Sequence, residues 1–334
     1  MTEERLTVAA IENLAEAALV AHGARAESAA ALARAIAAAE RDGMPAHGLA
    51  YLPTYCLHLD CGKVAGAAVP SLAETAPGVL VADAASGFAH PAIALGLAAL
   101  PPLARAQGVA ALAVRNSYNC GVLGYHTEQI AASGLVGIGF TNAPASIAPW
   151  GALKPVLGTN PWSLAVPGAD GAAFVIDQSA SVVAKSEVMK RARAGEALPT
   201  GWALDAEGKP TTDADAALKG TMMPSGGPKG VNAALLVEVM AACLAGAVPG
   251  VQASPFSGPA GGPPRTGQFF LAFDPNPSSG GLFADRLATV IEAFAAGPGS
   301  RLPGARRRAA RARADHDGVA VDSALLAQLR ALVP

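Results

Sequence analysis

The sequence predicts a mixed α/β protein with two domains, in which helices at both chain ends flank a β-rich middle. The 334 residues exceed the length at which a single hydrophobic core usually stops growing. With 51% hydrophobic and 15% charged residues, the chain has material for a large core and a buried subunit interface. Apolar residues recur at helical spacing near both ends and form short continuous runs between them, which indicates buried strands.

The N-terminal part of the chain predicts three helices. Apolar positions at helical spacing run from Thr7 to Asp42, with a break near His22-Gly23 that divides them into two helices. Gly43 to Gly48 predicts a loop. A short helix is expected from Leu49 to Leu59, ending at a turn.

The rest of the chain alternates between buried strands and helices, with a Pro/Gly loop from Gly250 to Gly267. Val231 to Ala245 is apolar on nearly every face and is predicted to be a buried helix. The predicted strands are Val79 to Ala84, Ala110 to Arg115, Val136 to Thr141, Trp162 to Val166, Ala173 to Ile176 and Gln268 to Phe273. The other predicted helices are Pro91 to Gln107, an amphipathic helix after Gly124, Ala180 to Ala194 and Gly281 to Ala296.

Charge and composition argue against several classes of partner. The net charge of −2 gives no electrostatic reason to expect a nucleic acid. No run of 18 apolar residues predicts a membrane span, and the acidic N-terminus does not resemble a signal peptide. The four cysteines lack metal-site or disulfide spacing, so we expect a reducing, cytoplasmic setting and no bound metal.

Two polar, backbone-rich loops flank the predicted strand at Val136. They run from Asn116 to Gly124 and from Thr141 to Pro161. Free N–H groups and small side chains suit a phosphate or a planar ring. These loops therefore predict a ligand site, without indicating a particular reaction.

Several other patterns favour ordinary structural roles. Gly137 to Asn142 resembles half of a Rossmann fingerprint, but Pro144 and Pro149 forbid the helix that should follow. Cys56, His58 and Cys61 have a spacing that spreads them around a helix, so packing is favoured over metal binding. The basic run from Arg306 to Arg313 is interpreted as a solvated helix face.

His47 is the candidate for proton transfer. It lies between Pro45 and Gly48, where the chain turns from one helix into the next. Its unperturbed pKa of about 6.5 suits acid–base work near neutrality. The alternative is a histidine that caps a helix end.

Several motifs are spread in order along the chain. They are His47-Gly48, TNAPASIAPWG from Thr141, GTNPW from Gly158, VIDQSAS from Val175, PTTD from Pro210, GGPKG from Gly226 and RLPGARR from Arg301. In these motifs the chain resembles the malate/L-lactate dehydrogenase type 2 family along nearly its whole length. The resemblance implies a non-Rossmann nicotinamide-binding fold. Residues 66–284 would form a cofactor and substrate domain with a largely antiparallel sheet, and residues 1–65 and 285–334 a helical domain.

The same resemblance implies an activity and its residues. We expect an NAD(P)H-dependent reductase of small 2-oxo or cyclic 2-imino acids, active as a homodimer with the active site near the subunit interface. His47 matches the proton donor, and Thr159 matches a residue near the substrate. NADPH is slightly favoured over NADH because Arg306 and Arg307 could hold a 2′-phosphate. The residues that match cofactor-binding positions are Tyr118, Asn119, Cys120, Gly121, Val122, Val175, Ile176, Asp177, Ser179, Pro228, Lys229, Gly304, Ala305 and Arg306.

Three positions depart from the family pattern, namely Ala46, Tyr51 and Pro228, where relatives have serine, arginine and a larger ring residue. Helical spacing predicts that Tyr51 lies on the same side as His47, with its hydroxyl facing the substrate. A phenol cannot replace the bidentate guanidinium, so groups near Thr159 or Lys154 are expected to help hold the substrate carboxylate. The alternative to a catalytic function for this chain is that it is a non-catalytic, dinucleotide-binding relative of the family.

Overall fold

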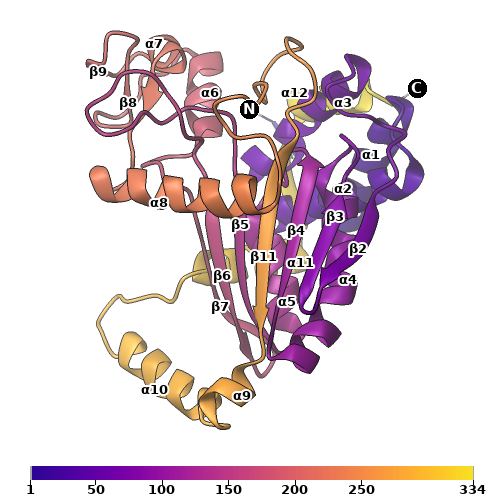
Figure 1. Cartoon of the computed structure of the whole chain (residues 1–334). Coiled ribbons are helices and arrows are strands. Elements are labelled where there is room, and N and C mark those ends of the chain that lie inside the picture. The colour runs from indigo at the N-terminus through magenta and orange to yellow at the C-terminus, as the bar shows by residue number, and fades with distance from the viewer. Residues whose placement is uncertain (1, 334) are drawn as a thin grey trace.

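The computed structural model describes residues 2–333, and its centre is a seven-stranded mixed sheet (Figure 1). The strand order is β2-β3-β4-β11-β5-β6-β7, in which β3 and β4 are parallel and every other neighbouring pair is antiparallel. The strands are β2 (Ser71–Ala76), β3 (Val79–Asp83), β4 (Val109–Ser117), β5 (Val136–Thr141), β6 (Trp162–Gly168), β7 (Gly171–Gln178) and β11 (Thr266–Phe273). The prediction of a mixed α/β fold with a mostly antiparallel sheet is therefore confirmed.

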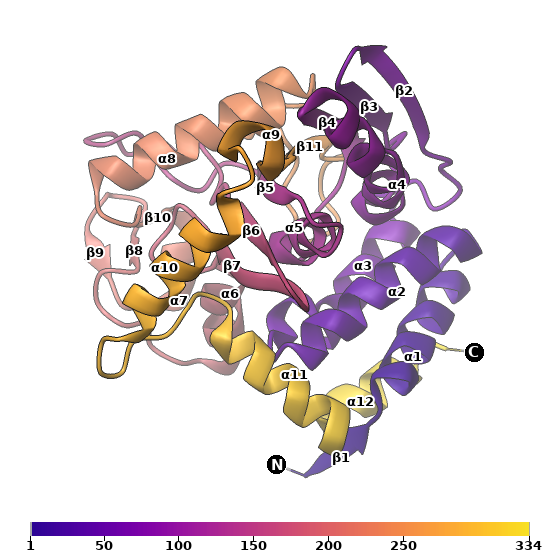
Figure 2. The same ribbon diagram turned by 90° about the horizontal axis from the view of Figure 1, so that it is seen from below.

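Helices cover both faces of this sheet because side chains alternate along each strand. On β11, Phe270 packs towards α4 (Ala89–Gln107) and α5 (Leu123–Ala132). Its neighbour Phe269 packs towards α8 (Pro228–Glu238), which continues as a π-helical turn over Val239–Leu244. The two layers lie on opposite sides of the sheet in Figure 2.

The glycines of the half fingerprint in β5 serve close packing. A Cβ on Gly137 would lie 2.8 Å from the Cβ of Ile130, and one on Gly139 would lie 2.8 Å from the Cγ2 of Thr127. Both neighbours belong to α5, so the absence of side chains allows this helix to lie directly on the strand. A long loop follows β5, as the two prolines predict.

The two chain ends pack together in a second core. It contains α1 (Val8–Ala21), α2 (Ala26–Arg41) and α3 (Leu52–Asp60), together with α11 (Ala305–Asp317) and α12 (Ser323–Arg330) (Figure 2). The break between the first two helices falls at His22 as predicted. Two short strands, β1 (Glu3–Leu6) and β12 (Val319–Asp322), pair antiparallel and were not predicted, because nothing local in the sequence specifies their pairing.

A third cluster forms a small lobe beside the sheet, seen at the upper left of Figure 1. Its helix α6 (Lys185–Ala194) begins later than the predicted Ala180, because Ser181 bridges to Pro224 in extended conformation. The other elements of the lobe are β8 (Ala203–Leu204), β9 (Pro210–Thr211), α7 (Ala214–Lys219) and β10 (Thr221–Met222).

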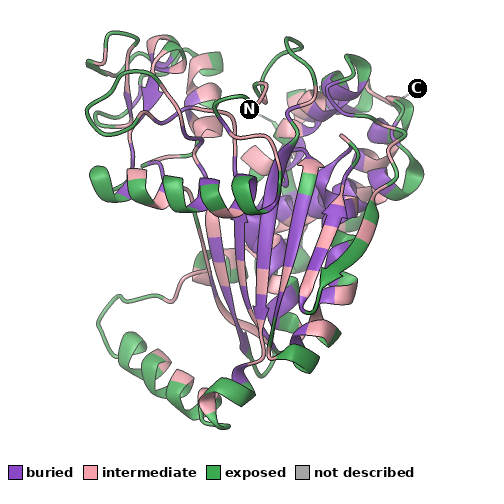
Figure 3. Cartoon of the chain, in the orientation of Figure 1, coloured by how far each residue is buried: buried purple, intermediate pink, exposed green. Residues whose placement is uncertain are grey.

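The prediction that the helix beginning near Val231 is buried on nearly every face is wrong. Its inner face, with Val237 and Ala241, is fully buried, but Leu235, Leu236 and Leu244 are 52–58% exposed. The sequence shows that the helix is apolar, whereas the sheet covers only one of its sides (Figure 3).

The helix α10 (Phe283–Ala295) is more exposed still. It follows α9 (Pro275–Ser279) and contains no buried residue, and it hangs below the sheet in Figures 1 and 3. Its apolar residues Val290 and Phe294 are 61% and 48% exposed. Within residues 2–333, no helix combines the length and apolarity that crossing a membrane requires.

Candidate active site

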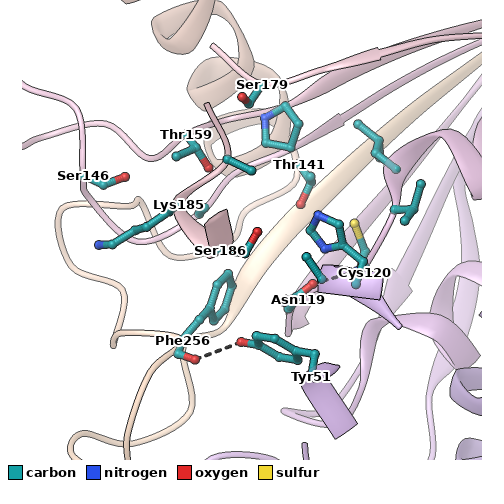
Figure 4. Close-up of a pocket in the computed structure, with 18 of the residues that line it drawn as sticks. Tyr51, Asn119, Cys120, Thr141, Ser146, Thr159, Ser179, Lys185, Ser186 and Phe256 are labelled. Atoms are coloured by element: carbon teal, nitrogen blue, oxygen red, sulfur yellow. Dashed lines mark hydrogen bonds between the residues drawn. The ribbon is translucent and has the colours of Figure 1, made fainter. Parts of the chain in front are cut away.

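A cavity of about 330 Å³ lies where the chain-end core, one end of the sheet and the small lobe meet. Five segments form its wall: residues 44–51, 119–123, 141–161, 177–189 and 255–257. Most of the wall is apolar, with a few polar groups converging on it, as is typical of a small-molecule site (Figure 4). The two loops that the sequence singled out both contribute to this cavity.

The helix α2 holds His47 in position. A 3₁₀ turn over Pro45–His47 is followed by a second one over Leu49–Tyr51, in place of the predicted loop and helix start. The buried carboxyl of Glu40 accepts the N–H of Leu49 at 2.7 Å, which fixes the chain just after His47. Among the described residues, none forms a hydrogen bond with the His47 imidazole, so its nitrogens are available to a ligand in the cavity.

Asp177 is the charged partner of His47. Burial lowers the pKa of His47, and the carboxylate of Asp177 acts in the opposite direction by favouring the imidazolium. Burial raises the pKa of Asp177, which is opposed by the guanidinium of Arg307 at 3.5 Å and by the N–H of Gly124 at 2.9 Å. His47 and Asp177 both line the cavity, and each favours the charged form of the other.

The turn from Asn119 to Val122 forms the next part of the wall. The side chain of Asn119 accepts the N–H of Gly121 at 2.6 Å, and the turn leads into the first residue of α5 at Leu123. Burial raises the pKa of Cys120 to about 12, so this thiol stays protonated and unreactive at neutral pH.

Thr159 reaches the cavity because Asn160 anchors the GTNP motif. Asn160 is fully buried with φ of 38°, and its amide donates to the Ala234 carbonyl at 2.9 Å and to Glu238 at 2.7 Å. Its Oδ1 accepts the N–H of Ala143 at 3.1 Å. A Cβ on Gly158 would lie 2.2 Å from the Ala143 oxygen, so only glycine fits there.

The loop from Gly250 to Gly267 closes one side of the cavity and is held by its main-chain carbonyls. Tyr51 donates to the Phe256 oxygen at 2.9 Å, as Figure 4 shows. Lys63, only 1% exposed, donates to the Pro255 oxygen at 2.6 Å and to the Gly258 oxygen at 3.0 Å. His58 contacts the same Gly258 oxygen with Nε2 at 3.0 Å.

These contacts bear on the expectations for Tyr51 and for the group Cys56, His58 and Cys61. Tyr51 lines the cavity together with His47, and its hydroxyl donates a hydrogen bond to the Phe256 oxygen, which leaves the phenol oxygen to accept from a ligand. His58 also bonds the Tyr118 hydroxyl, and Cys61 is exposed while Cys56 is buried. Packing is thus the role of this group. Among the described residues, no cluster of His, Cys, Asp and Glu is arranged to hold a metal.

Several expected site residues lie outside the cavity wall. Lys154, Lys229 and Arg306 are exposed. Tyr118 is buried behind the wall, and Val175 and Gly304 line a separate small pocket with Arg307. Ile176, Pro228 and Ala305 are not in the wall either.

The interpretation of the basic run as a wholly solvated helix face is wrong. Arg307 pairs with Asp177, and Arg311 bonds Asp42 at 2.8 Å and Glu128 at 2.9 Å. These carboxylates belong to segments distant in sequence, so the local alternation with alanine gave no indication of them.

The sequence gave no sign of three polar residues in the wall. Lys185, Ser146 and Ser186 line the cavity, and the two hydroxyls have no hydrogen-bond partner among the described residues. Buried hydroxyls without partners indicate a polar ligand, since such groups are rarely left unbonded.

Comparison with known proteins identifies the family of the chain. The sequence pattern of the family described as malate/L-lactate dehydrogenase matches residues 6–330. A (2R)-3-sulfolactate dehydrogenase (NADP(+)) of Chromohalobacter salexigens is 44% identical over 96% of this chain and 95% of its own length. A Delta(1)-pyrroline-2-carboxylate reductase of Ancylobacter novellus is 40% identical over 99% of this chain and 98% of its own.

The solved structures give the same result. Delta1-piperideine-2-carboxylate reductase from Pseudomonas syringae pvar. tomato superimposes with a TM-score of 0.93 and 34% identity, covering 98% of this chain and 99% of that one. The fold and the sequence similarity together define an oxidoreductase. The chain belongs to the malate/L-lactate dehydrogenase family.

Proposed function

We propose that this protein is an NAD(P)H-dependent reductase that acts on C2 of a small 2-oxo acid or cyclic 2-imino acid, with His47 as the proton donor. The observation that carries the proposal is the His47 imidazole, which lines the cavity beside Asp177 with no protein group bonded to its nitrogens. The relatives whose names specify such substrates support the reaction class.

The residues of the wall fit a nicotinamide ring beside a small acid. The apolar sides suit a flat ring, and the unpartnered hydroxyls of Ser146 and Ser186 call for polar ligand atoms. When bound, the nicotinamide supplies the hydride. His47 donates a proton to the oxygen or nitrogen on C2, and the Asp177 carboxylate stabilises the imidazolium. The loop at Phe256 keeps bulk water from that side.

We propose further that the cofactor is held by the turn at Asn119, Cys120, Gly121 and Val122, together with Asp177 and Ser179, all of which line the cavity. The remaining expected residues lie outside the wall, so their contacts would be to parts of a dinucleotide that extend beyond it. They are Tyr118, Val175, Ile176, Pro228, Lys229, Gly304, Ala305 and Arg306. NADPH is favoured because Arg306 is exposed and a 44% identical relative is named as NADP(+)-dependent.

A substrate screen tests the proposal. The protein is mixed with NADH or NADPH and a panel of 2-oxo and cyclic 2-imino acids, and cofactor oxidation is followed by absorbance at neutral pH. Turnover of at least one acid is expected. Cofactor binding without turnover of any acid would favour a non-catalytic dinucleotide-binding relative.

The Asp177→Asn variant is expected to move the pH profile of reduction to lower pH. Burial already lowers the pKa of His47, so reduction weakens as the pH rises through that value and the imidazolium is lost. Removing the Asp177 carboxylate takes away the influence that opposes this shift, so the pKa falls further. The profile of kcat against pH measures it, with Asp170→Asn at the exposed β6–β7 turn as the control. An unmoved profile would contradict a role for Asp177 at His47.

We also propose that the protein is a homodimer with its active site near the subunit interface. We assign the chain ends, 1–65 and 285–334, to a helical domain and 66–284 to the cofactor and substrate domain. The exposed apolar residues of α8 and α10 support the dimer, because amphipathic helices usually bury such a face.

Introducing two negative charges on α10 by substitution is expected to dissociate this dimer. The helix has no buried residue in its own chain, so Val290→Asp with Phe294→Asp should leave the subunit folded and expose the effect on association alone. Light scattering after size-exclusion chromatography should show a dimer for the wild type and a monomer for the double variant. Glu292→Gln, on the other side of α10, is the control. A monomeric wild type at micromolar concentration would contradict the proposal.

A further inference from the structure

Lys185 carries an isolated positive charge in the cavity wall. Within residues 2–333 it is the one lysine or arginine that lines the cavity, where it begins α6. Burial lowers the pKa of its ammonium group, and no described carboxylate offsets that effect. An ammonium partly withdrawn from water without a counter-ion is unfavourable, so its position is explained best by an anion that arrives with the ligand.

Two hydroxyls in the cavity wall also lack partners, and that of Ser146 lies on the side to which Lys185 extends. Ser146 is 4% exposed and Ser186 follows Lys185 on α6, and neither Oγ atom has a hydrogen-bond partner among the described residues. In the view of Figure 4 the Lys185 side chain extends towards Ser146 and away from Tyr51. The helix α6 has no side-chain cap, so the positive end of its dipole also faces an anion favourably.

The other ionisable groups in the wall limit the charge of the substrate. The Tyr51 hydroxyl already donates its hydrogen bond to the Phe256 oxygen, so it does not replace Lys185 as a donor. Asp177 lies in the same wall, but its carboxylate is already paired with Arg307 at 3.5 Å, so it offers no positive charge to a second anion. The wall therefore offers one site for a fully charged acid group.

We propose that Lys185, with the hydroxyl of Ser146, binds the substrate carboxylate, and that this one lysine, in a described wall that holds no second lysine or arginine, makes the enzyme selective for acids with one anionic group. The inference rests on the proposed reductase function. It separates two kinds of relative, since a sulfolactate carries two acid groups and a pyrroline-2-carboxylate carries one. This chain is assigned to the second kind.

Steady-state kinetics with matched acids tests the assignment. Wild-type kcat/KM is expected to be about tenfold or more higher for Δ1-pyrroline-2-carboxylate and pyruvate than for sulfopyruvate and oxaloacetate. Lys185→Met should raise KM for the better monoacid about tenfold or more with a smaller change in kcat, and Lys185→Arg should recover most of the loss. Lys190→Met, at an exposed position of the same helix, is the control. Ser146→Ala should raise KM by a few-fold.

Two results would overturn the inference: a KM unaffected by Lys185→Met, or a preference for the diacids. Calorimetric titration with pyruvate, in the presence of NADP⁺, separates this inference from the reductase proposal. If pyruvate binding depends on Lys185 but no acid is turned over, the reductase proposal is contradicted and the anion site at Lys185 is supported. If an acid is turned over but neither binding nor turnover depends on Lys185, the anion site is contradicted and the reductase proposal is supported. If neither Lys185-dependent binding nor turnover is observed, both the anion site and the reductase proposal are contradicted.

Discussion

Replacing His47 with alanine is expected to lower kcat for the reduction by about 10²–10⁴-fold, with little change in cofactor affinity. The imidazole is the group in the wall that can deliver a proton to the oxygen or nitrogen of the substrate, because Lys185 is assigned to the carboxylate and the Cys120 thiol stays protonated. Without the imidazole, charge would develop on the substrate atom with no positioned donor to neutralise it. The hydride-transfer step would then slow, while the residues that bind the cofactor and the acid remain in place.

The measurement is single-turnover oxidation of NAD(P)H with the best acid of the panel, together with a fluorescence titration of the cofactor. His316→Ala is a suitable control, because the His316 side chain is 87% exposed and far from the cavity wall. A His47→Ala enzyme that keeps more than about a third of wild-type turnover would refute the assignment of His47 as the acid.

The second large effect is expected from Asn160→Ala, which should lower the free energy of unfolding by about 3 kcal/mol. The substitution removes the acceptor for the partly buried N–H of Ala143 and the donors to the buried Ala234 and Glu238. It also places alanine at a φ of 38°, where asparagine is better tolerated. KM for the acid should rise as well, since Thr159 depends on this anchor.

Urea unfolding followed by circular dichroism measures the change. The control is Asn276→Ala on the exposed surface, where a change within about 0.5 kcal/mol is expected. If Asn160→Ala were no less stable than this control, the hydrogen bonds of Asn160 would not anchor the motif.

Elements that depend on local patterns were predictable. The strand Val136–Thr141 was predicted with both ends correct, because its apolar run ends where a polar Pro/Gly loop begins. The incorrect predictions concern tertiary contacts, which depend on segments distant in the sequence. For α8, apolarity was evident from Leu235 and Leu236, but the sequence does not say that the sheet covers only one side. The β1–β12 pair joins opposite chain ends and leaves no local trace.

In the candidate site, too, features set by local sequence were predictable and features set by tertiary contacts were not. The motifs located His47, Thr159 and the turn at Asn119, because each depends on a short run of turn-forming residues. The anion site remained hidden, because Lys185 and Ser146 come from different segments and become neighbours of one cavity only after folding. A lysine at the start of a helix and a serine in a loop are ordinary when they are considered singly.

The loop at Phe256 has a consequence for how specificity could diverge. Tyr51, His58 and Lys63 hold it through the carbonyls of Pro255, Phe256 and Gly258, which every amino acid has. The attachment therefore does not depend on which side chains the loop carries. Residues 255–257 border the cavity, so their side chains can be exchanged to suit another substrate while the fastening stays the same. Randomising these three positions is thus a route to new substrate preferences that leaves the proton-transfer groups untouched.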